Sequence, residues 1–394
     1  MTQTLLFSPW QLRDVTLRNR VMAAPMWQYA GRHWRPTDWH LMNLGRLADG
    51  GSGLVFQEGT TVERRGCGTV GDIGIWDDAA VPHLRRLVDI MQDCGAVPGI
   101  QLMHAGRKAR QKPPDQGRGP LLRTPEIADW DDWDVIAPSA ITLPGESAAA
   151  PRAMSEADIH AVIDAFVAAA RRADAAGYQV LDLHAAHGYL LHSFLSPLAN
   201  QRGDAWGGSL ANRMRFVLEI VAGVRAVWPA GKPIFVRLSV IDGAAGGWTL
   251  ADSVALVREM HRLGVDLIDC SAGGIAGSPL PAGQSASYGY QVDLAAAIRR
   301  ETGVPTSAVG LIVHASHAER ILREGACDLV ALARELIHNP NWPVDAAIKL
   351  GDDIGYRVMK TRGGFWLERR AATVPELRAS TQGEDELSPR ESPG

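Results

Sequence analysis

Two histidines and a tyrosine stand close together in the segment HAAHGY and are the residues best suited to chemistry in this chain. His184 and His187 are three positions apart, and Tyr189 follows two positions later. Two imidazole N–H groups aimed at one carbonyl oxygen would polarise that carbonyl, as an oxyanion hole does. A phenol, with an ordinary pKa of about 10, is a suitable proton donor to a carbanion. We therefore take these three side chains as the candidate catalytic group.

Two other roles for the histidine pair stay open. His184 and His187 could be half of a metal site, but no carboxylate or cysteine stands at ligand spacing to complete it, so we predict no metal. The two rings could also be structural, each satisfied by hydrogen bonds to the backbone.

Arg237 is a charge inside the apolar segment IFVRL. Arginine is almost never buried without a partner. One interpretation is an ion pair with a carboxylate inside the fold. The other is a fixed cation beside an electron-rich cofactor or an anionic intermediate.

The elements that position these residues follow one repeated unit, a β-rich apolar run and then a helical pattern. The strand-like runs are residues 20–24, 53–57, 97–102, 179–184, 234–239, 266–271, 305–309 and 328–333. The helical patterns are residues 39–48, 81–94, 156–176, 210–227, 250–263, 294–301, 315–325 and 343–350, with Ser155 placed to cap the third. Eight such repeats predict an α/β fold, a single (β/α)8 TIM barrel. A doubly wound sheet is the alternative, but no GxGxxG follows the first strand.

Active sites of such barrels lie at the carboxyl ends of the strands. Gln101 lies on the third strand, whereas Gly310 and Arg334 follow the seventh and eighth. Those last two ends are the usual phosphate site of the fold, built from backbone N–H groups and a helix N-terminus. Together with the histidine pair and Arg237, they predict a phosphorylated, redox-capable ligand.

Two stretches do not fit the repeat. Residues 108–147 form a long polar insertion after the third strand, which is a candidate lid. Residues 379–394 are polar and contain prolines, so we expect a disordered tail. The remaining chain, residues 1–378, has no linker composition and is expected to be one domain.

Composition excludes several classes of protein. The 394 residues carry a net charge of −4, and 46% of them are apolar, so no basic footprint suggests nucleic acid. No run of about 18 apolar residues predicts a membrane span, and no secretory signal is evident. The four cysteines are far apart, which argues against a CxxC cluster or a disulfide scaffold and favours a reduced, cytoplasmic setting.

One segment, HAAHGYLLHSFLSPLANQRGDAWGGSLANR at residues 184–213, closely resembles the hallmark of the Old Yellow Enzyme family of FMN-dependent NADH:flavin oxidoreductases. Further matches in the same order are APM at 24–26, GIQLMHAGRKA at 99–109, APSAI at 137–141, FVRLS at 235–239, GVDLIDCSAGG at 264–274 and ALARELIHNP at 331–340. The resemblance is closest to the bacterial thermophilic-like subgroup, which includes the xenobiotic reductases.

The resemblance implies FMN across the barrel mouth and NAD(P)H as the reductant. The cofactor-binding residues it implies are Ala24, Pro25, Met26, Gly59, Gln101, Arg237, Gly310, Ala333 and Arg334. It implies substrate contacts from Trp27, Tyr29, His184, His187 and Tyr189, with Tyr189 as the proton donor. Hydride would pass from NAD(P)H to the flavin and then to an activated alkene, an α,β-unsaturated carbonyl or nitro compound, in ping-pong kinetics. A homodimer or homotetramer is the habit of the family.

Other functions stay open beside an ene-reductase. A related flavoenzyme could act as a dehydrogenase, isomerase or dearomatising reductase on a specific metabolite. A non-flavin barrel aldolase is disfavoured because no lysine ends a strand run. A barrel that only binds FMN or a partner would not need the histidines and Tyr189.

The sequence departs from the subgroup at three places. Trp27 stands where the subgroup has a cysteine near the flavin, so the indole either narrows the site or packs away from it. Ala333 stands where glycine usually precedes the phosphate-binding arginine. Arg362 and Trp366 are candidates for the C-terminal residues that reach toward an active site in the subgroup, but they cannot be aligned.

Overall fold

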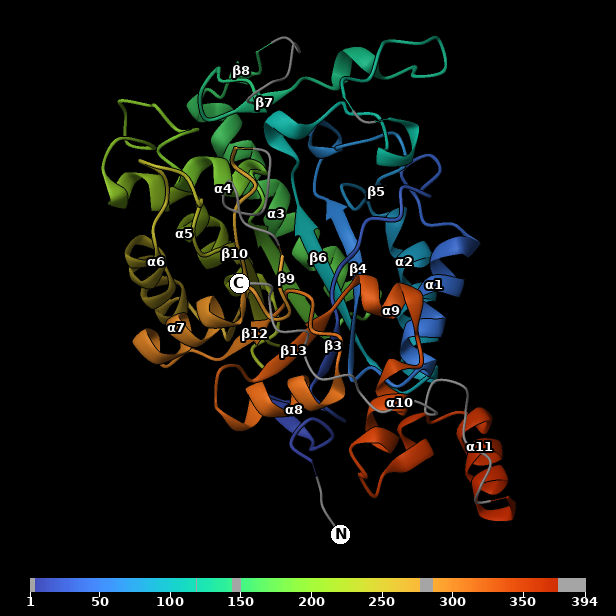
Figure 1. The fold of residues 1–394 in the computed structure, drawn as a ribbon. Helices are drawn as coiled ribbons and strands as arrows, with labels where there is room; N and C mark the ends of the chain where they lie inside the picture. The colour runs from blue at the N-terminus through green and yellow to red at the C-terminus, as the bar shows by residue number, and fades with distance from the viewer. Residues whose placement is uncertain (1–3, 118, 144–149, 277–285, 375–394) are drawn as a thin grey trace.

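The computed structural model describes residues 4–117, 119–143, 150–276 and 286–374. The predicted tail, residues 379–394, lies outside this part of the chain. Within the described ranges, eight parallel strands close into a barrel because β13 pairs with β3 and β3 pairs with β4. The barrel strands are β3 (Val21–Ala23), β4 (Leu54–Thr61), β6 (Val97–Met103), β9 (Val180–Ala185), β10 (Ile234–Ser239), β11 (Leu267–Ser271), β12 (Thr306–Ala308) and β13 (Leu329–Leu332). The predicted TIM barrel is confirmed (Figure 1).

Helices surround the barrel on its outside (Figure 1). The helices of the described residues are α1 (Asp38–Asp49), α2 (Ala80–Asp93), α3 (Glu156–Ala176), α4 (Leu190–Leu195), α5 (Leu210–Val227), α6 (Leu250–Arg262), α7 (Val292–Thr302), α8 (Ala315–Arg323), α9 (Arg334–His338), α10 (Trp342–Lys349) and α11 (Arg362–Thr373). Of these, α11 lies apart from the barrel, at the lower right of Figure 1. Ser155 caps α3 as predicted, since its side chain accepts from the backbone N–H of Asp158. No helix among the described residues is long and apolar enough to cross a membrane.

Several elements of the structure were not predicted from the strand–helix repeat of the sequence. A hairpin of β1 (Trp10–Leu12) and β2 (Val15–Leu17) precedes the barrel, and β5 (Ile73–Gly74) pairs with the end of β4. The helices α4, α9 and α11 are also additional. These elements are shorter than the windows in which periodicity can be recognised, or they stand outside the repeat.

The strand β4 runs to Thr61, four residues beyond the predicted end. Its pairing with β6 shifts between Gln57 and Gly59, which is a β-bulge at Glu58. The buried Glu58 carboxylate contacts His40 Nε2 of α1 at 3.0 Å, whereas Gly59 lines a cavity at the barrel mouth. The bulge therefore separates a structural carboxylate from a cavity-lining glycine on the same strand.

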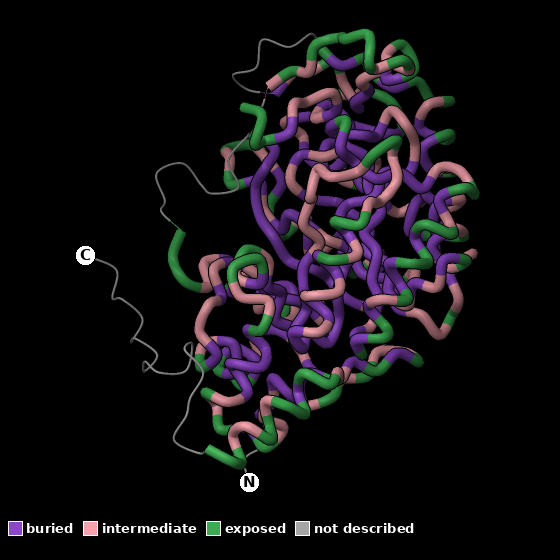
Figure 2. The backbone as a smooth tube through the Cα atoms, turned by 90° about the vertical axis from the view of Figure 1, so that its right-hand side faces the viewer, coloured by how far each residue is buried: buried purple, intermediate pink, exposed green. Residues whose placement is uncertain are grey.

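The lower half of the barrel is filled by apolar side chains. Val15 and Leu17 of the hairpin belong to the same buried cluster as Met22, Phe56 and Phe235 inside the barrel. Figure 2 shows this buried interior as purple chain under a more exposed outer layer. Among the described residues, this packing closes the end of the barrel where the strands begin, so a ligand is expected at the opposite end, where the strands finish.

Arg64 connects the insertion at residues 108–147 to the rest of the fold, because its guanidinium stacks between the indoles of Trp34 and Trp133. The guanidinium carbon of Arg64 lies 3.9 Å from the ring centroid of Trp34 and 3.8 Å from that of Trp133. Trp133 is fully buried, and its Nε1 donates to the carbonyl of Cys67 at 2.9 Å. The insertion also carries β7 (Ile136–Ala137), which pairs with β8 (Arg152–Ala153). Its closure over a ligand stays a prediction.

Candidate active site

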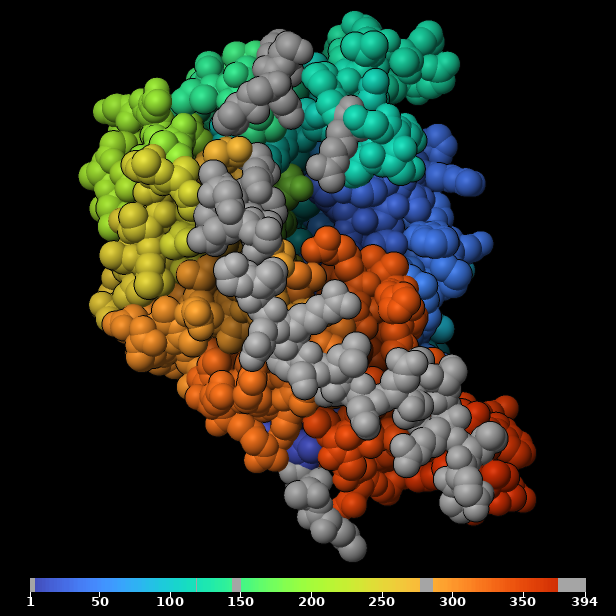
Figure 3. All heavy atoms as spheres, in the orientation of Figure 1, coloured from blue at the N-terminus to red at the C-terminus, as the bar shows by residue number. Residues whose placement is uncertain are grey.

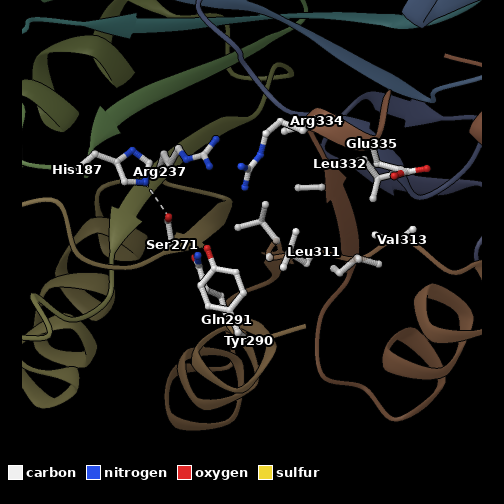
Figure 4. Close-up of a pocket in the computed structure, with 15 residues that line it drawn as sticks. His187, Arg237, Ser271, Tyr290, Gln291, Leu311, Val313, Leu332, Arg334 and Glu335 are labelled. Atoms are coloured by element: carbon white, nitrogen blue, oxygen red, sulfur yellow. Dashed lines mark hydrogen bonds between the residues drawn. The ribbon is translucent and has the colours of Figure 1, made fainter. Parts of the chain in front are cut away.

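Two adjoining cavities lie at the carboxyl ends of the barrel strands and share the side chains of His187 and Arg237. The first, about 210 Å³, is named here the aromatic cavity, and its lining residues are Pro25, Trp27, Tyr29, Gly59, Gln101, Met103, His184, His187, Tyr189 and Arg237. The second, about 320 Å³, is named the arginine cavity. Its polar lining is His187, Arg237, Ser271, Tyr290, Gln291, Arg334 and Glu335, with backbone from Gly310 and Ala333 (Figure 4). Figure 3 shows the surface of the molecule in the same orientation as Figure 1, coloured by position in the chain.

The histidines meet as neutral rings at right angles. His184 Nε2 and His187 Nδ1 are 3.4 Å apart, and the ring planes are perpendicular. Burial, followed by the charge of Arg237, holds the pKa of both rings well below the ordinary value. At neutral pH each imidazole is therefore uncharged and offers one N–H donor.

Tyr189 stands between the histidines and the aromatic residues of the cavity. Its ring centroid lies 4.9 Å from that of His184 and 5.3 Å from that of Trp27, both edge to face. The cavity lining thus places the phenol beside the paired imidazoles. This arrangement brings together the three residues that the sequence suggested as a catalytic group.

Trp27 lines the cavity rather than packing away from it. Its Nε1 donates to the carbonyl of Gly59 at 2.9 Å, and its ring contacts Tyr29 with centroids 5.8 Å apart. A Cβ on Gly59 would lie 2.6 Å from Met103 Sδ and 3.1 Å from Trp27 Nε1. A side chain at position 59 would therefore collide with the residues that line the cavity.

Arg237 has one carboxylate partner and one unused donor. Its Nη1 lies 3.4 Å from Asp269 Oδ2, so the predicted interior ion pair is present. Its Nε is buried with no hydrogen-bond partner among the described residues. Since Arg237 lines both cavities, the cation also faces the space where a ligand would lie.

Gln101 is oriented by a buried carboxylate on the next strand. Its Nε2 donates to Asp182 Oδ2 at 2.7 Å, which leaves the amide oxygen for another partner. Burial, followed by the neighbouring Asp269 carboxylate, raises the pKa of Asp182 to about 8. Asp182 is therefore largely protonated at neutral pH, which limits the negative charge under the cavity.

Lys108 reaches the site although it lies beyond the end of β6. Its Nζ donates to the carbonyls of His187 at 2.6 Å and Gly274 at 2.9 Å, and it lies 5.3 Å from the ring centroid of Tyr189. Because β6 ends at Met103, the expectation that no lysine ends a strand run is not contradicted, although this side chain reaches back to the site. The ammonium is nevertheless engaged with backbone oxygens, which gives it a structural role.

The arginine cavity has the features of a phosphate site. Gly310 has φ +117°, and a Cβ there would lie 3.1 Å from Tyr290 Cε1 and 3.2 Å from Gln291 N. Arg334 points into the cavity toward Arg237 (Figure 4). Ala333 has φ −124° and ψ −94°, so it does not adopt the positive φ for which glycine is favoured.

A flavin mononucleotide fits this pair of cavities. The aromatic cavity offers the Gln101 amide for a flavin ring, and the arginine cavity offers Arg334 and the open backbone at Gly310 for a phosphate. The buried Arg237 Nε and Gln291 Oε1 are polar atoms without partners among the described residues, as expected where a polar ligand completes the site. No group of three or more potential metal ligands exists in the described chain.

Two of the residues predicted to bind the cofactor lie outside the linings of these cavities. Ala24 and Met26 follow β3 and line neither cavity; both line a smaller cavity together with residues of α1, and Ala24 N donates to Leu332 O. Only their backbone can contribute to a ligand site at the barrel mouth.

Arg362 and Trp366 lie on α11, far along the chain from the barrel strands, and Trp366 is 63% exposed.

Sequence reasoning assigned no role to Met103, Ser271, Tyr290 or Gln291, which also line the cavities. Ser271 is the last residue of β11, so its position at a strand end was a usable signal. Tyr290 and Gln291 precede α7 without any motif, and no pattern in the sequence marks them.

Residues 5–353 match the model of the NADH:flavin oxidoreductase / NADH oxidase family. The chain belongs to this family. Its resemblance to the Old Yellow Enzyme is thereby confirmed, and the protein is an FMN-dependent oxidoreductase that uses NAD(P)H.

Several proteins are similar to this chain over most of its length. An NADPH dehydrogenase of Geobacillus sp. (strain WCH70) is 43% identical over 363 residues, which are 92% of this chain and 99% of that protein. Morphinone reductase is 26% identical with a TM-score of 0.74, over 88% of this chain and 90% of that one. An old yellow enzyme homologue from Zymomonas mobilis is 25% identical with a TM-score of 0.70, over 86% of this chain and 91% of that one.

Two longer solved structures are matched over only part of their length. The chain spans 52% of a 2-naphthoyl-CoA reductase, at 24% identity and a TM-score of 0.77. It spans 48% of histamine dehydrogenase from Rhizobium sp. 4-9, at 27% identity and a TM-score of 0.74. The first of these likenesses shows the fold alone.

Proposed function

We propose that this flavin oxidoreductase is an ene-reductase that uses NAD(P)H to reduce alkenes conjugated to a carbonyl or nitro group, in ping-pong kinetics. The observation that carries the proposal is the pair of neutral imidazoles beside Tyr189. His184 Nε2 and His187 Nδ1, 3.4 Å apart, can both lie within hydrogen-bond distance of one substrate oxygen.

Polarisation of the substrate is the first task of these residues. A hydrogen bond to the carbonyl or nitro oxygen draws electron density from the conjugated double bond and makes its β-carbon electrophilic. Uncharged donors suit a neutral substrate, because a bound oxygen is stabilised without the cost of burying a second cation beside Arg237.

Proton delivery is the task of Tyr189. Reduction of the alkene adds a hydride at the β-carbon and a proton at the α-carbon, so the site needs a donor near the substrate. The Tyr189 phenol lies in the same cavity as the imidazoles and can supply that proton. Its proton is restored from solvent at the open mouth.

Residues of both cavities would hold the cofactor. FMN bound there supplies the hydride transfer between the nicotinamide and the substrate. Gln101 would bind the ring edge, and Gly310 with Arg334 would bind the phosphate. Arg237, which lines both cavities, would place a positive charge beside the bound cofactor and would stabilise negative charge that develops on it.

Absorption spectroscopy of the purified enzyme under anaerobic conditions tests the proposal. Addition of NADPH or NADH should bleach the flavin bands, and cyclohexenone should then restore them. Bands that stay bleached after cyclohexenone would contradict the ene-reductase function and leave the flavin oxidoreductase class intact.

A dehydrogenase, isomerase or dearomatising reductase acting on a specific metabolite is the second candidate. The position of Trp27 favours it, because the indole occupies the cavity next to Tyr189 and restricts the shape of a substrate. Histamine dehydrogenase shares the fold at 27% identity. Failure of simple enones, together with reoxidation by another electron acceptor, would support this second candidate.

A further inference from the structure

We propose that Ser271 is a positioning residue that determines which nitrogen of His187 carries the proton when a substrate oxygen binds. This inference rests on the proposed role of the histidine pair in binding that oxygen. Ser271 ends β11, and its side chain is buried. Its Oγ lies 2.7 Å from His187 Nε2, the interaction drawn as a dashed line in Figure 4.

The backbone of His187 is held in place by several contacts. When a ligand binds, the ring can therefore adapt by moving its proton from one nitrogen to the other. The residue has φ +60°, an uncommon conformation for a side chain other than glycine. Its N–H donates to Ser239 Oγ at 2.9 Å, and its carbonyl accepts from Lys108 Nζ at 2.6 Å. A Cβ on the following Gly188 would lie 2.3 Å from Gly274 O, so the turn is closely packed on both sides.

The hydrogen bond that His184 accepts determines which of its two ring nitrogens carries the proton. His184 Nδ1 accepts from the backbone N–H of Ala186 at 3.2 Å, so the proton of the neutral ring sits on Nε2. That N–H faces His187 Nδ1 at 3.4 Å. Without substrate, His187 therefore accepts at Nδ1, carries its own proton on Nε2 and donates to Ser271 Oγ.

A substrate oxygen between the two rings requires the opposite arrangement. His184 Nε2 already donates, but His187 can donate to the same oxygen only if its proton is on Nδ1. His187 Nε2 then becomes an acceptor and needs a donor. A hydroxyl can both accept and donate, so Ser271 serves either state by rotation of its O–H.

The Ser271 hydroxyl has one alternative role, which is to bind the cofactor instead of His187. Ser271 also lines the arginine cavity and could act only on the cofactor. A role through His187 and a role through the cofactor differ in one respect, which is whether the effect of losing the hydroxyl depends on the presence of His187.

The first experiment measures the 15N chemical shifts of His187 in the FMN-loaded enzyme, without ligand and with bound 4-hydroxybenzaldehyde, a phenol whose oxygen can occupy the same place. We expect the proton on Nε2 in the free enzyme and on Nδ1 in the complex. A proton that stays on one nitrogen in both states overturns the proposal. Ser307→Ala is the matched control, since it removes a buried hydroxyl that donates to Asp269 and should leave the His187 shifts unchanged.

The second experiment is a double-mutant cycle on the affinity for the same phenol, followed by its long-wavelength band with the flavin. Ser271→Ala should raise Kd about tenfold, as expected for loss of one hydrogen bond that positions a donor, and Ser271→Thr should restore most of the affinity. In a His187→Ala background the further change Ser271→Ala should have no effect. An equal effect in both backgrounds would assign the hydroxyl to the cofactor and overturn the proposal.

Failure of the proposed ene-reductase function would give a different experimental result from failure of the role of Ser271. If the wild-type enzyme binds FMN but gives no band with phenols, the histidines do not bind the oxygen, and the proposed function itself fails. If the band forms while Ser271→Ala leaves Kd unchanged, only the role of Ser271 is wrong.

Discussion

The indole Nε1 of Trp27 donates a hydrogen bond to the backbone carbonyl of Gly59 across 2.9 Å. This contact joins the loop after β3 to the bulged part of β4 and turns the indole into the aromatic cavity. Gly68 provides the room at the far edge of the ring, since a Cβ there would lie 3.0 Å from Trp27 Cη2. Glycines at positions 59 and 68 thus accommodate a residue much larger than the cysteine of the subgroup.

Replacement of this indole should change which substrates are accepted. In Trp27→Cys the cavity enlarges beside Gly59, so kcat/KM should rise for alkenes with bulky β-substituents relative to cyclohexenone, and the flavin midpoint potential should shift. Trp27→Phe is the control, because it keeps an aromatic ring and loses only the N–H. If Trp27→Cys alters neither the substrate profile nor the potential, the indole has no role in specificity.

The double variant His184→Ala, His187→Ala should lose binding of phenols. Both donors to the ligand oxygen are removed, and we expect Kd to rise about 100-fold or more, since two hydrogen bonds of about 1.5 kcal/mol each are lost. The measurement is a titration with 4-hydroxybenzaldehyde that follows the long-wavelength flavin band. His160→Ala, on the exposed face of α3, serves as the control. A band that persists in the double variant would show that the oxygen binds elsewhere.

Loss of Arg334 should weaken the affinity for FMN. Arg334→Ala removes one of the two arginines that line the arginine cavity, and a charge-assisted bond of about 1.5–3 kcal/mol corresponds to roughly 10- to 100-fold in Kd. Quenching of free FMN fluorescence by the apoprotein gives the affinity. Arg86→Ala on the exposed surface of α2 should leave it unchanged. An unaltered Kd in Arg334→Ala would place the phosphate elsewhere.

Asp182→Asn should change how stability depends on pH. Burial raises the pKa of Asp182 to about 8, so between about pH 4 and 8 the folded protein holds a proton that the unfolded chain releases. The free energy of unfolding therefore falls as pH rises through this window, by up to about 1.4 kcal/mol per unit from this carboxyl.

Asparagine carries no such proton and can still accept from Gln101, so the variant should lack this part of the slope. Urea unfolding of the FMN-loaded enzyme at pH 5, 6.5 and 8 measures the effect. Asp115→Asn, at an exposed position of the insertion, should keep the wild-type slope. Equal slopes in Asp182→Asn and wild type would mean that the carboxyl is ionised in the fold.

Arg64→Lys should loosen the insertion. Lysine keeps the charge but cannot stack as a plane between Trp34 and Trp133, and we expect a loss of about 1–2 kcal/mol in the free energy of unfolding. Residues 108–147 should become more sensitive to limited proteolysis. Arg123→Lys, whose partner Asp131 is exposed in the same insertion, should change little. An unchanged cleavage pattern in Arg64→Lys would show that other contacts hold the insertion.

Periodicity alone sufficed to predict the barrel. Most barrel strands contain a short apolar run, because they are buried on both faces, and each predicted strand is followed by a helical pattern. The strand ends then follow from the fold, and with them the placement of His184, His187, Arg237, Gly310 and Arg334 at one rim.

Other relationships depended on contacts between distant segments, which no local pattern reveals. The orientation of Trp27 is decided by Gly59 and Gly68, about 30 and 40 residues further along the chain. The contact of Ser271 with His187 crosses 84 positions, and the carboxylates around Arg237 come from two other strands.

The sequence by itself determined the class of fold, the family and the types of residue at the mouth of the barrel, since strand and helix patterns and short motifs are local properties. Only the tertiary structure decided the protonation of those residues and the orientation of their rings. Burial and neighbouring charges set the pKa of a side chain, and hydrogen-bond partners set its direction, and both come from parts of the chain that meet only after folding.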